Sequence, residues 1–162
     1  MLEICRYLEF RRTAFAGGEF TGLTAFVISD DWSGEGTGEF VVEDIQKLSE
    51  DLNQLVSRNG DEVWFTASEV DESGHIAVRV RASEREGQFD CRIRFATHYD
   101  STPPEGMFRF EVELKAFSSA MKKFVDQLRA LASGETIHAR LDLEHQGFQS
   151  RRSNARKGQS RG

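Results

Sequence analysis

The residues that could do chemistry in this chain are few, and their spacing does not gather them into a site. No two of the four histidines, His75, His98, His138 and His145, lie three or four residues apart on an expected helix. The two cysteines form no Cys-x-x-Cys motif, so the sequence carries no local signature of a zinc site. We therefore expect neither a metal ion nor another cofactor.

Cys91 and His98 are the best candidates in the sequence for a nucleophile and its base. They lie seven residues apart in one expected strand, where an odd-numbered and an even-numbered residue point to opposite faces. This alternation argues against a Cys–His pair within the strand. His98 beside Asp100 could still act as an acid or base, and Cys5 could meet a distant histidine. We expect a protein that is not an enzyme, with a small enzyme as an alternative.

Two pairs of acidic residues, Asp30-Asp31 and Asp71-Glu72, fall in expected turns. Paired carboxylates can do acid–base or metal chemistry, but in turns they more often accept hydrogen bonds from backbone amides. Neither pair has the spacing of a calcium-binding loop. We expect no catalytic residue among them and treat them as surface groups.

The two tryptophans have different surroundings in the sequence. Trp32 follows Asp30-Asp31 in a loop, where it is either an interface anchor or a ring folded back over the sheet edge. Trp64 lies in an expected strand and is predicted to belong to the core. The candidate partner-binding residues are therefore all in loops: Asp30, Asp31, Trp32, Asp71 and Glu72.

Residues 61–114 are expected to form the framework of the fold as four consecutive strands joined by short turns. In residues 75–81, apolar residues at even positions alternate with Arg79 and Arg81, as in a strand with one buried face. Residues 89–95 and 108–114 repeat the alternation. The pattern predicts an antiparallel sheet that is apolar on one face and charged on the other.

The charged face of this sheet allows two interpretations. It would carry five arginines opposite two glutamates: Arg79, Arg81, Arg92, Arg94 and Arg109, with Glu111 and Glu113. A cross-strand ladder of opposite charges is the interpretation we favour. The alternative is a guanidinium-rich docking surface for an acidic partner or a phosphate backbone.

The first part of the chain predicts three more strands. Residues 2–10 alternate, and residues 23–28 form an apolar run typical of a strand buried on both faces. Residues 34–40 alternate glycine with polar residues and predict a weaker strand, with a bulge or a close backbone approach. Residues 136–141 predict a last strand near the end of the chain.

Two amphipathic helices are expected, and their apolar stripes match at a constant offset of 76 residues. The first helix opens at Glu43-Asp44 and ends at Asn59-Gly60. The second starts near Ser118-Ser119, one of which would be the N-cap, and ends at Ser133-Gly134. The stripes are Ile45, Leu48, Leu52 and Leu55, and Met121, Phe124, Leu128 and Leu131.

The expected fold class is α+β, an antiparallel meander sheet with the two helices packed on one face. The order of elements also allows two βββ-α-β halves, through either a duplication or a chance likeness of two amphipathic helices. A single domain is expected over residues 1–144. Residues 145–162 form a basic tail that is expected to be disordered.

Charge and composition limit the classes of partner. The net charge is −6, and residues 145–162 hold five basic and no acidic residues, so residues 1–144 carry −11. An acidic body argues against nucleic-acid binding. The chain starts with no basic, apolar leader, and no apolar run reaches the ~20 residues of a membrane helix. We expect a cytoplasmic protein with free, packed cysteines.

The order of features resembles the WapI-type immunity proteins and their uncharacterised bacterial relatives. The resemblance covers about residues 20–132 and comprises the Trp32 loop, the first helix, the Trp64 strand, Gly74-His75-Ile76 after an acidic turn, and the helix around residues 124–128. It implies a protein that binds and neutralises a toxin domain, and it implies no catalytic residue. We therefore expect a toxin domain as the partner. The alternatives are a structural or regulatory module, and an edge strand would also allow two copies to pair.

Overall fold

The computed structural model describes residues 6–13, 21–29, 32–57, 60–68, 74–98 and 107–144. Its elements, in chain order, are β1 (Tyr7–Thr13), β2 (Thr21–Ile28), β3 (Ser33–Phe40), α1 (Val42–Val56), β4 (Glu62–Ser68), β5 (Gly74–Ala82), β6 (Gln88–His98), β7 (Met107–Phe117), α2 (Ser118–Ser133) and β8 (His138–Asp142). Both halves of the chain thus run strand, strand, strand, helix, strand, as the sequence predicted.

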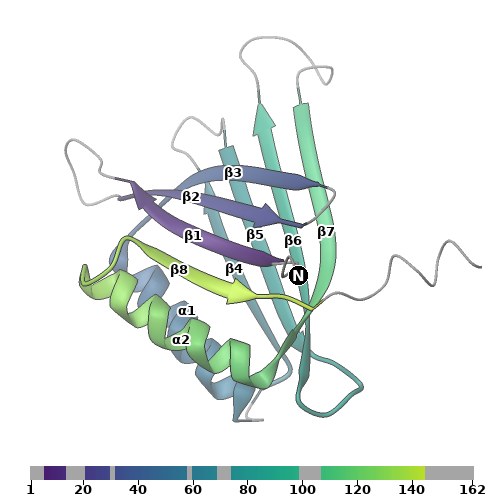
Figure 1. The fold of residues 1–162 in the computed structure, drawn as a ribbon. Coiled ribbons are helices and arrows are strands. Elements are labelled where there is room, and N and C mark those ends of the chain that lie inside the picture. The colour runs from purple at the N-terminus through teal and green to yellow at the C-terminus, as the bar shows by residue number, and fades with distance from the viewer. Residues whose placement is uncertain are drawn as a thin grey trace, which may run out of the picture.

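All eight strands belong to one antiparallel sheet, in the order β7-β6-β5-β4-β3-β2-β1-β8. Among the described residues, β3 and β4 are joined by one pair, Glu39 with Ser68. The sheet therefore bends there into two four-stranded halves, β8-β1-β2-β3 and β4-β5-β6-β7, that face each other across the core (Figure 1).

Each half of the sheet is completed by the last strand of the other half of the chain. β4 pairs with β5, with Trp64 opposite Arg79, and β8 pairs with β1, with Arg140 opposite Glu9. The β4–β5 junction joins strands that are consecutive in the chain, whereas the β8–β1 junction joins strands from opposite ends of the described chain. The two chain halves therefore depend on each other for their sheets.

The core lies between the two half-sheets and the helices. α1 and α2 lie side by side, with α2 along β8 and α1 beside β4 (Figure 1). Phe10 of β1 is fully buried, and its ring centroid lies 5.5 Å from that of Phe65 on β4 and 5.8 Å from that of Phe124 on α2. Val78 and Ile93 are buried in the same core, which confirms the predicted common apolar face.

The alternating glycines of β3 let this strand cross the opposite half-sheet at close range. A Cβ atom on Gly34 would lie 2.7 Å from the Phe110 ring, and one on Gly36 would lie 2.6 Å from the Phe95 ring. A Cβ atom on Gly38 would lie 2.7 Å from the backbone oxygen of Ala67. These distances confirm the predicted close backbone approach.

The structure confirms the expected bounds of the second helix and corrects its N-cap and the end of the first helix. α1 ends at Val56 rather than at Asn59-Gly60, and the hydroxyl and N–H of its C-cap Ser57 both donate to the Asn53 carbonyl. At α2 the N-cap is Phe117, and neither expected serine caps the helix. The Ser118 N–H instead donates to the Gly87 carbonyl at 2.8 Å. Neither helix is long and apolar enough to cross a membrane within the described part of the chain.

The prediction that β2 is buried on both faces is wrong. Leu23, Ala25 and Val27 face the core and are buried, whereas Phe26 and Ile28 on the outer side are only half-buried. The reason is that no described element covers the outer side of β8-β1-β2-β3. The strand therefore has the usual alternation of a half-covered sheet.

Candidate binding surface on the outer sheet face

Of the five predicted partner-binding residues, only Trp32 is among the residues that the structure describes. Asp30, Asp31, Asp71 and Glu72 lie outside the described residues. Trp32 is half-buried, and its ring centroid lies 5.5 Å from that of Phe110, which in turn stacks on Phe95 at 5.6 Å. Trp32 therefore packs back onto the sheet, as in the second of its two predicted positions.

Trp64, which was predicted to be core, is instead 60% exposed. Val63 and Phe65 on either side of it are buried, so the alternation of β4 turns Trp64 outward. The sequence did indicate this outward orientation, because Trp64 stands at an even-numbered position of the strand, like the polar residues Glu62 and Thr66. The indole lies on the charged face of the sheet.

We call the outer side of β4–β7 the outer arginine face. Its described charged side chains are five cations and four acids: Arg79, Arg81, Arg92, Arg94 and Lys115, with Glu62, Asp90, Glu111 and Glu113. Among the described residues, two large apolar side chains are exposed on this side, Trp64 on β4 at 60% and Phe117 at the end of β7 at 50%. The side chain of Arg109 lies outside the described part of the chain.

Trp64 is held beneath a fixed guanidinium group. The Arg79 guanidinium carbon lies 5.0 Å from the centroid of the Trp64 ring, within the range of a cation–π contact. The Nη2 atom of Arg79 donates to Glu62 Oε2 at 3.0 Å. Arg79 is thus fixed between a carboxylate and an aromatic ring, which restricts the rotamers of all three side chains.

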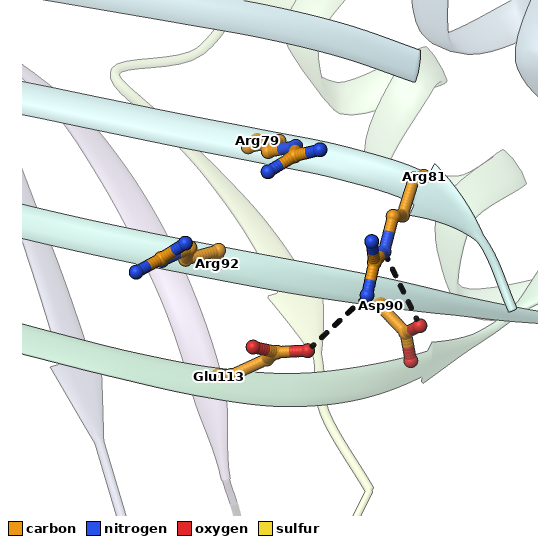
Figure 2. Close-up of a pocket in the computed structure, with 5 residues that line it drawn as sticks. All are labelled: Arg79, Arg81, Asp90, Arg92 and Glu113. Atoms are coloured by element: carbon orange, nitrogen blue, oxygen red, sulfur yellow. Dashed lines mark ion pairs between the residues drawn. The ribbon is translucent and has the colours of Figure 1, made fainter. Parts of the chain in front are cut away.

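The favoured charge ladder is confirmed on β5–β7. Arg81 lies 3.6 Å from Asp90 and 3.9 Å from Glu113 (Figure 2), and Lys115 lies 3.2 Å from the other oxygen of Asp90. Such exposed pairs stabilise a fold by at most about 1 kcal/mol each. They enclose a small hollow of about 70 Å³ lined by Arg79, Arg81, Asp90, Arg92 and Glu113.

Arg94 is left outside this ladder. It lies directly opposite Glu111, but Glu111 accepts a hydrogen bond of 2.6 Å from Arg92 Nε. Among the described residues Arg94 has no ion-pair partner, and its side chain is exposed. The face therefore presents one uncompensated guanidinium group beside the small side chain of Ala77.

The outer side of the other half-sheet shows how this chain covers aromatic rings elsewhere. Glu9, with a side chain only 7% exposed, lies 3.1 Å from Arg11 and 3.5 Å from Arg140. Arg140 lies 3.8 Å from the centroid of the Tyr7 ring, and Arg11 lies 5.1 Å from that of Phe26. Both rings are half-buried. Trp64 is thus more exposed than either of these rings, although Arg79 lies over it at 5.0 Å.

Comparisons with protein-family models, with curated proteins and with solved structures gave no match.

The candidate catalytic groups do not form a site in the described residues. The thiol of Cys91 is free and fully buried, while Asp100 and the side chain of His98 lie outside the described residues. No group of three or more His, Cys, Asp or Glu residues in the described ranges is placed to hold a metal ion. Burial, together with the charge of Asp90, raises the pKa of Cys91 to about 12.

The raised pKa of Cys91 predicts a loss of stability at alkaline pH. Between pH 9 and 12 the folded chain keeps the thiol proton, whereas the unfolded chain, with a thiol pKa near 9.0, releases it. Stability therefore falls as the pH rises, by about 1.4 kcal/mol per pH unit from this group. Urea unfolding at pH 8, 9.5 and 10.5 measures the slope. Cys91→Ala is the control, because it keeps every other titrating group, and equal slopes would contradict the prediction.

Proposed function

We propose that this chain is a non-catalytic protein-binding domain that docks through its outer arginine face. The observation that carries the proposal is Trp64, a large aromatic side chain on β4 that is 60% exposed on the charged outer arginine face. Tryptophan and arginine dominate the binding energy of protein interfaces. An indole left in water on a rigid strand is therefore best explained by a surface that another protein covers.

The contacts around Trp64 prepare the face for binding. Arg79 is already fixed by Glu62 and by the indole ring, so docking would freeze few additional rotamers there. Arg94 supplies an uncompensated cation on the same face. A partner that presents an apolar side chain over Trp64 and a carboxylate to Arg94 would satisfy both groups.

We further propose that the partner is a toxin domain and that docking blocks its active site. This part of the proposal is supported by the resemblance to the WapI-type immunity proteins. The net charge of −11 on residues 1–144 would attract a basic partner at long range, and the outer arginine face would then contact acidic groups on that partner. A regulatory protein without toxin activity is the alternative, and a second copy of this chain is another.

The experiment measures the affinity of the purified chain for the product of the adjacent gene. Trp64→Ala is expected to weaken binding by about 30-fold, which corresponds to about 2 kcal/mol for one hot-spot aromatic. Ile137→Ala is the matched control, because Ile137 is also an exposed apolar side chain, at 63%, but lies outside the outer arginine face. Equal affinities for the two variants would refute docking through Trp64.

A separate measurement distinguishes the partner classes. If the adjacent product is a toxin, its expression alone should arrest growth, and co-expression of this chain should restore it. Growth restored equally well by Trp64→Ala would contradict occlusion through this face. Binding without any effect on growth would support the regulatory alternative.

A further inference from the structure

The edge strand β7 (Met107–Phe117) has an open side. It is the terminal strand of the sheet and pairs only with β6 among the described residues. Figure 1 shows it at the margin of the sheet, with β6 on one side and no described strand on the other. With 11 residues it is as long as any strand of the fold.

One hydrogen bond reveals which backbone groups of β7 point to the open side. The Glu144 N–H donates to the Lys115 carbonyl at 2.7 Å, so the backbone groups of Lys115 point away from β6. In an antiparallel pair these directions alternate along the strand. The N–H and C=O groups of Glu111 and Glu113 therefore also point to the open side, whereas those of Val112 point to β6.

The side chains along this edge indicate which residue types an added strand would need. Glu111 and Glu113 lie on the outer arginine face with side chains 45% and 57% exposed. Phe110 and Val112 lie on the inner side, half-buried against the core. A strand added here would place one row of its side chains beside the two glutamates and the other row beside the two apolar residues.

Charge disfavours the pairings of β7 with a second copy that are centred on Val112, Glu111 or Glu113. An antiparallel pair of β7 strands centred on Val112 would place Glu111 opposite Glu113 twice. A pair centred on either glutamate would place that glutamate opposite itself. Like charges directly opposite each other destabilise a strand pair. A strand with basic residues on its outer row would instead form favourable cross-strand pairs.

We propose that β7 is a second binding site, which accepts an extended segment of another protein with alternating basic and apolar residues. The segment adds as a ninth strand. It bonds the open backbone groups of Glu111 and Glu113, sets its basic side chains against their carboxylates, and covers Phe110 and Val112 with its apolar side chains. The site shares Glu111 and Glu113 with the outer arginine face but does not include Trp64.

The test uses a seven-residue peptide of alternating lysine and valine with blocked ends. Added to the ¹⁵N-labelled chain, it is expected to slow hydrogen exchange at the amides of Glu111 and Glu113. Glu113→Pro is expected to weaken peptide binding about tenfold relative to Glu113→Ala, because both remove the carboxylate but only proline removes the open N–H. Proline is tolerated on edge strands. Trp64→Ala should leave peptide binding unchanged, so the two sites are tested separately.

Three outcomes would overturn the proposal. In the first, the peptide leaves the Glu111 and Glu113 amides unprotected, a measurement on the unaltered chain that does not depend on the folding of the proline variant. In the second, a peptide with glutamate in place of lysine binds equally well. In the third, a chain ending at Glu144 loses protection that the full chain already has without peptide, which would make residues 145–162 the occupant.

Discussion

Replacing Phe10 with alanine is expected to lower the free energy of unfolding by about 4 kcal/mol, within the range for a buried phenylalanine. The Phe10 ring is fully buried and contacts Phe65 of the opposite half-sheet and Phe124 of α2. Its removal would leave a cavity where both half-sheets and a helix meet. Neither a strand nor a helix can move to fill that space without losing contacts elsewhere.

Urea denaturation followed by circular dichroism measures this change. Phe117→Ala is the control, because it deletes the same phenyl group from a side chain that is 50% exposed. It is expected to cost about 1 kcal/mol, since only half of that side chain leaves water on folding. Similar losses for the two variants would mean that the half-sheets do not meet at Phe10.

Replacing Gly38 with alanine is expected to cost about 3 kcal/mol, at the upper end of the range for overpacking. The added methyl would lie 2.7 Å from the Ala67 carbonyl oxygen and 2.8 Å from its carbon. Both are backbone atoms of β4, so no side-chain rotation relieves the contact. Gly36→Ala is expected to cost less, about 2 kcal/mol, because its nearest atoms belong to the Phe95 side chain.

Gly60→Ala is the matched control for both glycine variants. A Cβ atom there would have no heavy atom within 4 Å, so the substitution should leave stability unchanged or raise it by about 0.5 kcal/mol through the unfolded state. The free energies of unfolding of the three variants provide the comparison. If Gly38→Ala were as stable as Gly60→Ala, β3 would not cross the opposite half-sheet at this distance.

Much of the fold followed from local periodicity. The alternation of residues 75–81 predicted β5 and its buried face, and the apolar stripes predicted both helices and the strand–strand–strand–helix–strand order. The glycines of β3 predicted a close approach, but not its target. The partners, the Phe110 and Phe95 rings and the Ala67 backbone, come from a distant part of the chain, so no local pattern names them.

The candidate binding surface was harder to predict than the fold. The parity of Glu62, Trp64 and Thr66 indicated that Trp64 faces outward, but its aromatic character favoured a core position. For Trp32 the sequence left two positions open, an interface anchor or a ring folded back over the sheet edge, and the structure shows the second, with the ring packed on Phe110. The alternation of the strand would have placed Trp64 correctly, whereas the loop sequence around Trp32 could not decide between its two positions.

The sequence by itself determined the strands, the helices and, except for β2 and for Trp64 on β4, the face that each one buries, because these depend on side-chain periods of two and 3.6 residues. The tertiary structure alone decided that β8 pairs with β1, that β3 crosses the opposite half-sheet at close range, and that the Trp32 ring packs on Phe110. The reason is that strand pairing across the chain and the covering of a face depend on contacts between remote residues. The same backbone hydrogen bonds could form with any strand, and only the fit of the whole core selects the partner.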